Sequence, residues 1–134
     1  MTETMPGDVL VAATRAFAAG DVDGWLARAH DDIVLELPYA PPGSPSRVEG
    51  KTAVAEYLRT VPAGIDFQQL DFDVHQTVAA EAAAVEWTAK GVVRATGAAY
   101  EMTYVVVLTL RDGLMRTYRD YWNPLVLLDT LGAA

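Results

Sequence analysis

The stretch "RDGLMRTYRDYWNPL", residues 111–125, carries the clearest structural signals in the chain. Its Asp112-Gly113 pair is typical of a tight hairpin turn, so the segments on either side should be antiparallel strands. The segment "LMRTYRDYW" after the turn predicts a strand, whose side chains alternate between two faces. Asn123-Pro124 has the residue types of a helix N-cap and a first helical residue. The stretch therefore predicts a hairpin whose second strand leads into a short C-terminal helix.

One acidic residue of this strand lies among large aromatic residues. Alternation places Tyr118, Asp120 and Trp122 on one face and Arg119 and Tyr121 on the other. Because neighbouring strand residues point apart, Arg119 is not the expected partner of Asp120. A buried carboxyl group without a cation has a raised pKa, which suits proton transfer near neutral pH. The alternative is an Asp120 buried only for a structural hydrogen bond, or paired with Arg119 across a dimer interface.

The length, net charge and composition of the chain exclude several classes of protein. The length of 134 residues fits one domain, which we assign to residues 1–134. The net charge of -8 argues against nucleic acid and anionic membranes as partners. The absence of cysteine excludes thiolate nucleophiles and fits a reducing compartment. The N-terminus does not resemble a signal peptide and the apolar runs are too short to span a bilayer, so we expect a cytoplasmic location.

Helices are predicted in the first half of the chain. Apolar residues recur at helical spacing in residues 8–20, 21–30 and 51–61. Asp8 is the expected N-cap of the first helix, and Gly20 is expected to end it.

Strands are predicted in the remainder, where the apolar period changes to two. The first covers residues 31–38, and four more follow at 67–78, 82–93, 99–110 and 114–122. The proline-rich segment 39–50 is expected to be a loop, either a lid over a site or only a connection. This order of elements indicates an α+β fold, in which a curved sheet with helices on its concave side forms a cone with an apolar interior.

The order of elements resembles the nuclear transport factor 2-like superfamily. The resemblance rests on "GDVDGWLARAHDDIVLELP" (20–38), "EGKTAVAEYL" (49–58) and "RDGLMRTYRDYWNPL" (111–125), and it covers nearly the whole chain. Relatives include SnoaL-like polyketide cyclases, ketosteroid isomerase-like proteins, limonene epoxide hydrolase-like enzymes and the phenazine-biosynthesis A/B proteins. The resemblance implies a cystatin-like α+β barrel: a cone-shaped, curved antiparallel sheet with three N-terminal-half helices on its concave face and a short C-terminal helix.

Asp120 matches an acid that the resemblance identifies as catalytic in the epoxide hydrolases and the phenazine proteins. The epoxide hydrolases also use an Arg and a second Asp, where this chain has Trp87 and Ala89. They use a Tyr and an Asn on the first strand, where this chain has Leu35 and Leu37. The set of residues that would activate a water molecule is therefore mostly missing.

We predict a cofactor-independent acid/base enzyme, an isomerase, cyclase or dehydratase that acts on a small hydrophobic, cyclic or polyketide-type molecule. Asp120 would move the proton, while Tyr118 and Tyr104 would polarise an oxygen atom. The expected substrate-binding residues are Trp25, Leu35, Leu37, Tyr57, Trp87, Met102 and Trp122. Tyr57 lies where the phenazine proteins have a histidine, and any of the aromatic residues could instead belong only to the core. The alternative functions are an epoxide-opening hydrolase or cyclase, and a non-catalytic small-molecule binding protein.

No metal site and no cofactor are expected. His75 should lie on the outer face of the sheet, and His30 should end the second helix, where the helix dipole favours it. The resemblance implies a homodimer formed through the convex face of the sheet. The residues expected on that face are Glu86, Thr88, Lys90, Thr103, Val105, Val107 and Tyr121.

Overall fold

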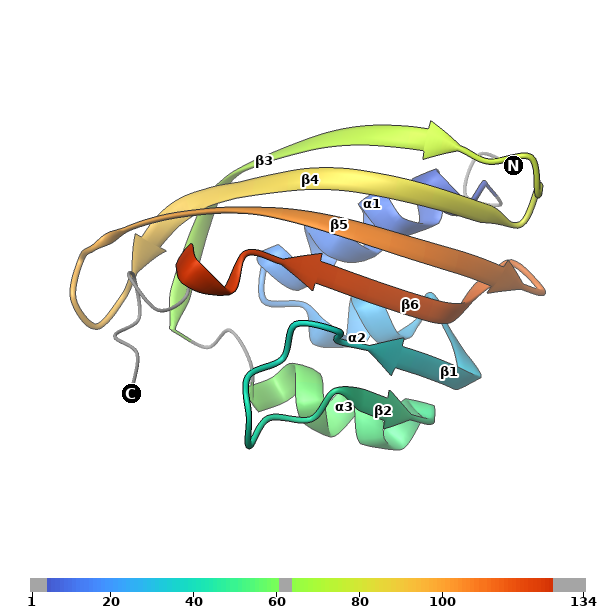
Figure 1. Cartoon of the computed structure of the whole chain (residues 1–134), viewed down its shortest axis with the longest axis horizontal. Helices are drawn as coiled ribbons and strands as arrows, with labels where there is room; N and C mark the ends of the chain where they lie inside the picture. The colour runs from blue at the N-terminus through green and yellow to red at the C-terminus, as the bar shows by residue number, and fades with distance from the viewer. Residues whose placement is uncertain (1–4, 61–63, 127–134) are drawn as a thin grey trace.

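The computed structural model describes residues 5–60 and 64–126, which form one curled sheet with helices on one side (Figure 1). The strand order in the sheet is β2-β1-β6-β5-β4-β3. The elements are α1 (Pro6–Ala18), α2 (Val22–Leu26), β1 (Ala29–Glu36), β2 (Arg47–Glu49), α3 (Lys51–Thr60), β3 (Ile65–Gln76), β4 (Ala82–Val93), β5 (Ala99–Arg111) and β6 (Leu114–Trp122). No helix within the described ranges is long and apolar enough to cross a bilayer.

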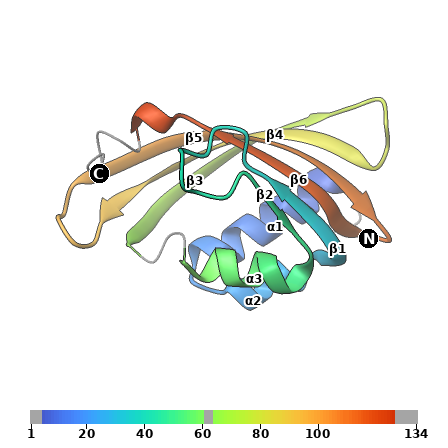
Figure 2. The same cartoon turned by 60° about the horizontal axis from the view of Figure 1, so that its bottom comes forward.

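The predicted α+β architecture is confirmed, with three helices beneath the concave side of the sheet (Figure 2). The sheet is open, since β2 and β3 form its two edges. One pair of strands differs from the predicted antiparallel arrangement, because β1 and β6 run parallel, with Leu35 opposite Tyr118. The chain passes through β2, α3 and the three-stranded meander β3–β5 before β6 returns to the free side of β1. This return brings residues of β1 beside the strand that carries Asp120.

The hairpin signal is confirmed in detail. Asp112 and Gly113 both have positive φ angles, 55° and 77°, as a two-residue type I′ turn requires. At the other end of β6, the side chain of Asn123 accepts a hydrogen bond from the backbone N–H of Leu125 at 3.0 Å. Residues 124–126 are helical, and the remainder of the predicted C-terminal helix lies outside the described residues.

The first helix begins earlier than predicted. It starts at Pro6 rather than Asp8, with Met5 as the N-cap residue. Proline is favoured at the first helical position, because its fixed φ suits a helix and its missing N–H has no partner there. The helix ends as predicted before Gly20, whose φ of 89° is accessible to glycine at little cost.

The second helix is shorter than predicted. Its N-cap is Asp21, whose side chain accepts a hydrogen bond from the N–H of Gly24 at 2.9 Å. It ends at Leu26, and the prediction that His30 ends this helix is wrong. His30 belongs to β1, which begins at Ala29, because pairing of Ala29 with Met115 of β6 draws this segment into the sheet.

A short strand, β2, lies inside the segment predicted to be a loop. It pairs with β1, with Arg47 opposite Glu36. Glu36 accepts hydrogen bonds from Arg47 and from Arg119 of β6, each at 3.1 Å, so it ties three strands together on the convex face. Arg119 therefore pairs with Glu36, as expected for a residue that points away from Asp120.

The sheet curls where β3 and β4 lie at one edge. A bulge interrupts β3 between Phe67 and Gln69, and Phe67 faces Gly91 of β4. A side chain at Gly91 would collide with the backbone of Asp66, so glycine allows the two strands to approach closely there. Bulges bend a strand and increase its twist, which helps the sheet to wrap around the helices.

The hydrophobic core fills one end of this cone. Val85, Val106, Leu108 and Met115 of the sheet and Leu10 of α1 are fully buried in this core. The other end, towards the start of β5 and the end of β6, remains hollow.

Candidate active site

A cavity of about 470 Å³ lies between the sheet and the helices. This volume is within the range of pockets that bind small molecules. All ten residues that the sequence singled out as catalytic or substrate-binding line it: Trp25, Leu35, Leu37, Tyr57, Trp87, Met102, Tyr104, Tyr118, Asp120 and Trp122. They come from α2, α3, β4, β5, β6 and the segment formed by β1 and the residue after it. The fold therefore brings together one acid, several hydroxyl groups and flat aromatic walls.

Asp120 is the acidic residue of this cavity. Its Oδ1 atom is enclosed and has no hydrogen-bond partner, while the rest of the residue borders the cavity. Burial raises the pKa of Asp120 from an ordinary value of 3.8 to about 8, because desolvation disfavours the charged form. No Lys, Arg or His occurs among the described residues that line the cavity. Asp120 can therefore exist in both protonation states near neutral pH, as a proton shuttle requires.

Tyr104 forms a hydroxyl pair with Tyr100, a cavity residue that the sequence analysis missed. The two hydroxyl oxygens are 2.6 Å apart, and the residues lie on the same face of β5, four positions from each other. Burial raises the pKa of Tyr104 well above its ordinary value, and it also raises the pKa of Tyr100. The pair therefore stays neutral and can offer an O–H group to a ligand. The alternation of Tyr100, Met102 and Tyr104 was the signal that could have identified it.

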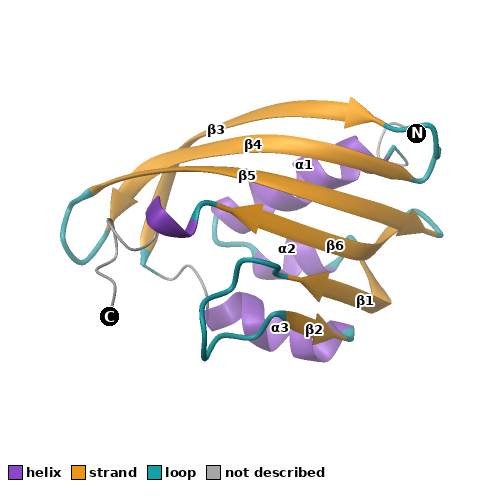
Figure 3. Cartoon of the chain, viewed as in Figure 1, coloured by secondary structure: helices purple, strands orange, loops and turns teal. Residues whose placement is uncertain are grey.

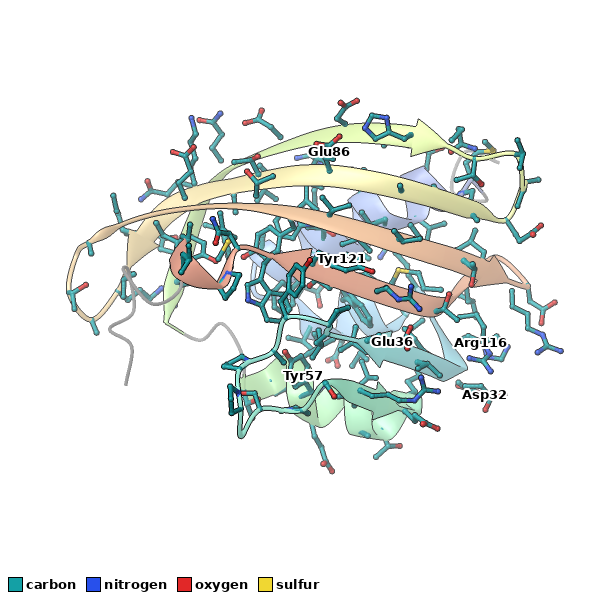
Figure 4. The ribbon with its side chains drawn as sticks, in the orientation of Figure 1. Asp32, Glu36, Tyr57, Glu86, Arg116 and Tyr121 are labelled. Atoms are coloured by element: carbon teal, nitrogen blue, oxygen red, sulfur yellow. The ribbon has the colours of Figure 1, made fainter. Side chains whose placement is uncertain are left out.

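Tyr118 and Tyr57 are two further tyrosines that line the cavity with Asp120. Burial raises the pKa of Tyr118 well above its ordinary value, and the charge of Asp120 adds to the shift. The ring of Tyr118 meets Trp25 of α2 edge-on, with centroids 5.5 Å apart. Tyr57 is on α3 (Figure 4), and burial followed by the charge of Asp120 raises its pKa to about 12. Both hydroxyl groups therefore stay protonated near neutral pH, and the charge of Asp120 contributes to both pKa shifts.

A row of aromatic residues crosses four strands beside Asp120. Phe72, Trp87, Tyr104 and Trp122 occupy directly opposite positions on β3, β4, β5 and β6. Trp87 is stacked between Phe72, with centroids 6.0 Å apart, and Tyr104, with centroids 4.1 Å apart. The indole Nε1 atoms of Trp87 and Trp122 are buried and have no hydrogen-bond partner. The row therefore combines a rigid wall with two unused hydrogen-bond donors.

The loop between β1 and β2 forms another wall, and Figure 3 shows it beside β1 and α3. Ala40, Pro41, Ser44 and Pro45 of this loop line the cavity. The loop is closed at its base, where the N–H of Leu37 donates to the carbonyl oxygen of Ser46 at 2.9 Å.

An aromatic contact fixes the start of this loop. The ring of Tyr39 meets that of Tyr121 edge-on, with centroids 5.5 Å apart. Because Tyr121 follows Asp120 in β6, this contact ties the loop to the strand that carries the acid.

The histidines lie outside the cavity. His75 is exposed on the outer face of β3, as predicted, and its Nε2 atom is 2.8 Å from a carboxylate oxygen of Glu86 and 3.5 Å from one of Asp73. Ligand atoms of these three residues lie within 4.8 Å of one another, a spacing that could hold a metal ion. The sequence analysis saw no such group because Glu86 comes from the neighbouring strand.

Comparison with known families agrees with this architecture. Residues 10–118 match the sequence model of the SnoaL-like domain. The chain belongs to the SnoaL-like family. The nuclear transport factor 2-like resemblance is thereby confirmed. The matched range ends two residues before Asp120, so the match supports the fold and leaves the acid to be judged from the cavity itself.

Three similar proteins illustrate the family. An uncharacterised PhzA/B-like protein of Pseudomonas aeruginosa is 36% identical over 125 residues, which are 93% of this chain and 89% of that protein. A Bacillus subtilis protein provisionally assigned as an isomerase has a crystal structure with a TM-score of 0.83 and 34% identity, covering 91% of each chain. A Silicibacter protein provisionally assigned as a polyketide cyclase has a TM-score of 0.78 and 25% identity, covering 96% of this chain and 98% of the other.

Proposed function

We propose that this SnoaL-like protein is a cofactor-independent acid/base enzyme that moves a proton within a small, hydrophobic, ring-containing molecule, as an isomerase or a cyclase. The observation that carries the proposal is Asp120, an unpaired carboxyl group with a pKa of about 8 in a mostly apolar cavity. A pKa near the working pH makes an acid effective both in taking up and in returning a proton. The provisional assignments of the Bacillus and Silicibacter proteins as isomerase and polyketide cyclase support the same class of reaction.

The chemistry follows from the positions of the polar groups. As a carboxylate, Asp120 removes a proton from a carbon atom next to a carbonyl group, and the electron pair moves onto the carbonyl oxygen. The hydroxyl pair of Tyr100 and Tyr104 donates a hydrogen bond to that oxygen as its negative charge develops. In an isomerisation, Asp120 returns the proton to another carbon of the conjugated system. In a cyclisation, the enolate carbon attacks a second carbonyl of the same molecule, and the new alkoxide takes the proton from Asp120.

Epoxide hydrolysis fits the cavity less well. Asp120 is the single acidic residue among the described lining residues, and no arginine accompanies it. A second acid to activate water is therefore missing from the described wall.

The proposal can be tested without knowledge of the natural substrate. The ketone 2-tetralone has acidic C–H groups beside its carbonyl, so proton removal in D2O replaces them with deuterium, which NMR detects. We expect the protein to accelerate this exchange, and Asp120→Asn to reduce the acceleration by about 100-fold or more, the usual contribution of a general base. The matched control is Asp71→Asn, an exposed carboxylate on the other face of the sheet, which should leave the rate unchanged.

The outcomes separate an enzyme from a binding protein. If 2-tetralone binds and Asp120→Asn leaves the exchange rate unchanged, the proton-shuttle role is wrong. If it binds and exchange is never faster than in buffer, the non-catalytic binding protein becomes the better description.

A further inference from the structure

We propose that the cavity selects an uncharged molecule with hydrogen-bond-accepting oxygen atoms, and that Trp87 and Trp122 determine this preference by donating their indole N–H groups to those atoms. The inference deepens the proposed function, since it describes the substrate class of the same cavity. It identifies two specificity-determining residues that take no part in proton transfer.

The charges of the wall exclude anionic ligands. The described lining residues include one acid and no Lys, Arg or His, so a carboxylate or phosphate group would find no counter-charge. Asp120 in its ionised form would repel such a group. Cations are also disfavoured near neutral pH, because burial keeps most Asp120 protonated and the surrounding tyrosines neutral. A neutral ligand is therefore the best match to this wall.

The unpaired polar groups of the wall are rich in donors. Trp87 Nε1 and Trp122 Nε1 carry one N–H each, have no acceptor in the structure and cannot accept a hydrogen bond themselves. The pair of Tyr100 and Tyr104 uses one hydroxyl proton internally and retains the other. Buried polar groups in native proteins are almost always hydrogen-bonded, so a bound molecule is expected to supply the missing acceptors. Carbonyl and ether oxygens supply them without adding charge.

The packing of Trp87 leaves its edge for this contact. Phe72 and Tyr104 cover the two faces of its indole ring, at interplanar angles of 22° and 12°. Arg15 of α1 lies 5.0 Å from the centroid of Phe72 and supports the outer side of the stack. Because both faces are packed, the ring edge is the part of Trp87 left for a ligand, and the proposed donor is the buried N–H group on that edge. Because Trp87 is only 6% exposed and held on both faces, the direction of this donor is fixed.

The two indole groups belong to a row of residues beside Asp120 in the sheet. Trp122 lies across from Tyr104, which in turn lies across from Trp87, so a single row holds both donors. Asp120 is two residues before Trp122 on the same face of β6. An oxygen atom bound by this row would place the neighbouring carbon atoms of the ligand towards the carboxyl group.

The test uses four bicyclic probes of matched shape: tetralin, 2-tetralone, 2-aminotetralin and tetralin-2-carboxylate. Their dissociation constants are measured by calorimetry at pH 7 for the wild-type protein and for Trp87→Phe and Trp122→Phe, which keep an aromatic ring and remove the N–H. We expect 2-tetralone to bind most tightly to the wild-type protein. Each substitution should raise the dissociation constant of 2-tetralone by about tenfold, as expected for the loss of one buried hydrogen bond. The dissociation constant of tetralin should stay nearly unchanged.

Trp25→Phe is the matched control, because the Trp25 ring also borders the cavity, where it meets Tyr118 edge-on, but its indole nitrogen is not one of the buried donors without a partner. It should change the affinities for tetralin and 2-tetralone by the same factor. A second measurement does not depend on the folding of any variant: in the NMR spectrum of the wild-type protein, 2-tetralone should shift the indole N–H signals of Trp87 and Trp122, whereas tetralin should not.

The inference is overturned if 2-tetralone binds no better than tetralin, if either ion binds most tightly, or if the Phe substitutions weaken both neutral probes equally. These outcomes concern selectivity. The proposed proton transfer fails separately, through an unchanged exchange rate in Asp120→Asn, so the two failures can be told apart.

Discussion

Replacing Asp120 by Asn should make the protein more stable, by an amount that grows with pH. In the folded state burial raises the pKa of Asp120 from 3.8 to about 8, so the folded protein holds this proton more tightly than the unfolded chain does. Through Asp120, the free energy of unfolding does not vary with pH below pH 4. It falls as the pH rises from 4 to 8 and is constant again above pH 8. Asn remains neutral throughout and shows no such loss.

The size of the effect follows from the shift. Each pKa unit corresponds to about 1.4 kcal/mol, so the loss of stability at pH 7, where the unfolded chain has ionised and folded Asp120 is still mostly protonated, is about 4 kcal/mol. This is an upper value, because the cavity that Asp120 borders can admit water. Total stabilities of domains are typically about 5–15 kcal/mol, so the difference is readily measured.

The assay is urea unfolding of the wild-type protein, Asp120→Asn and the control Asp71→Asn at intervals from pH 4 to pH 9. The free-energy difference between Asp120→Asn and wild type should be smallest at pH 4 and increase up to about pH 8, while the control should run parallel to wild type. Any constant effect of the amide group cancels, because only the change with pH is used. A difference that stays constant across this range would refute the reasoning, since it would mean that Asp120 titrates normally in the folded protein.

Three further predictions concern the cavity and the outer face. The rate at which the protein catalyses hydrogen exchange in 2-tetralone should rise with pH and level off near pH 8, as Asp120 becomes the carboxylate base. A catalysed rate that does not depend on pH below 8 would exclude Asp120 as the base. Tyr100→Phe should lower this rate by about tenfold or more, because Tyr104 then loses its hydroxyl partner; equal rates would leave the pair without a role in catalysis. We also propose that the protein forms a homodimer through the convex face, where Val107 is 40% exposed. Sedimentation should then show that Val107→Lys produces monomers, whereas Val78→Lys, at a fully exposed position, does not; a monomeric wild-type protein would contradict this proposal.

Much of the local structure could be predicted, because it depends on residues close together in the chain. Asp112-Gly113 needs positive φ angles wherever it lies, and Asn123 caps the residues that follow it. The alternation of β6 placed Asp120 and Arg119 on opposite faces before any partner was known. One error was also local in origin: Pro6 competes with Asp8 as the start of α1, and both lie within one turn.

Other features depend on which strands become neighbours. The strand Arg47–Glu49 is too short to show alternation, and it exists because β1 offers it a free edge. The hydroxyl contact between Tyr100 and Tyr104 requires a curved strand and enclosing helices, which no pattern in β5 specifies. Glu86 and His75 meet only because β3 and β4 pair in one particular register.

The sequence by itself determined that a carboxyl group and two large aromatic side chains share one face of β6, since a strand alternates regardless of its surroundings. It also showed which residue types were available for the wall. Only the tertiary structure decided that no described Lys, Arg or His lines the cavity beside Asp120, that Arg119 is held by Glu36 instead, and that the cone stays hollow there. The physical reason is that desolvation and pairing of a charge depend on atoms brought from distant parts of the chain, and those atoms set the pKa of Asp120.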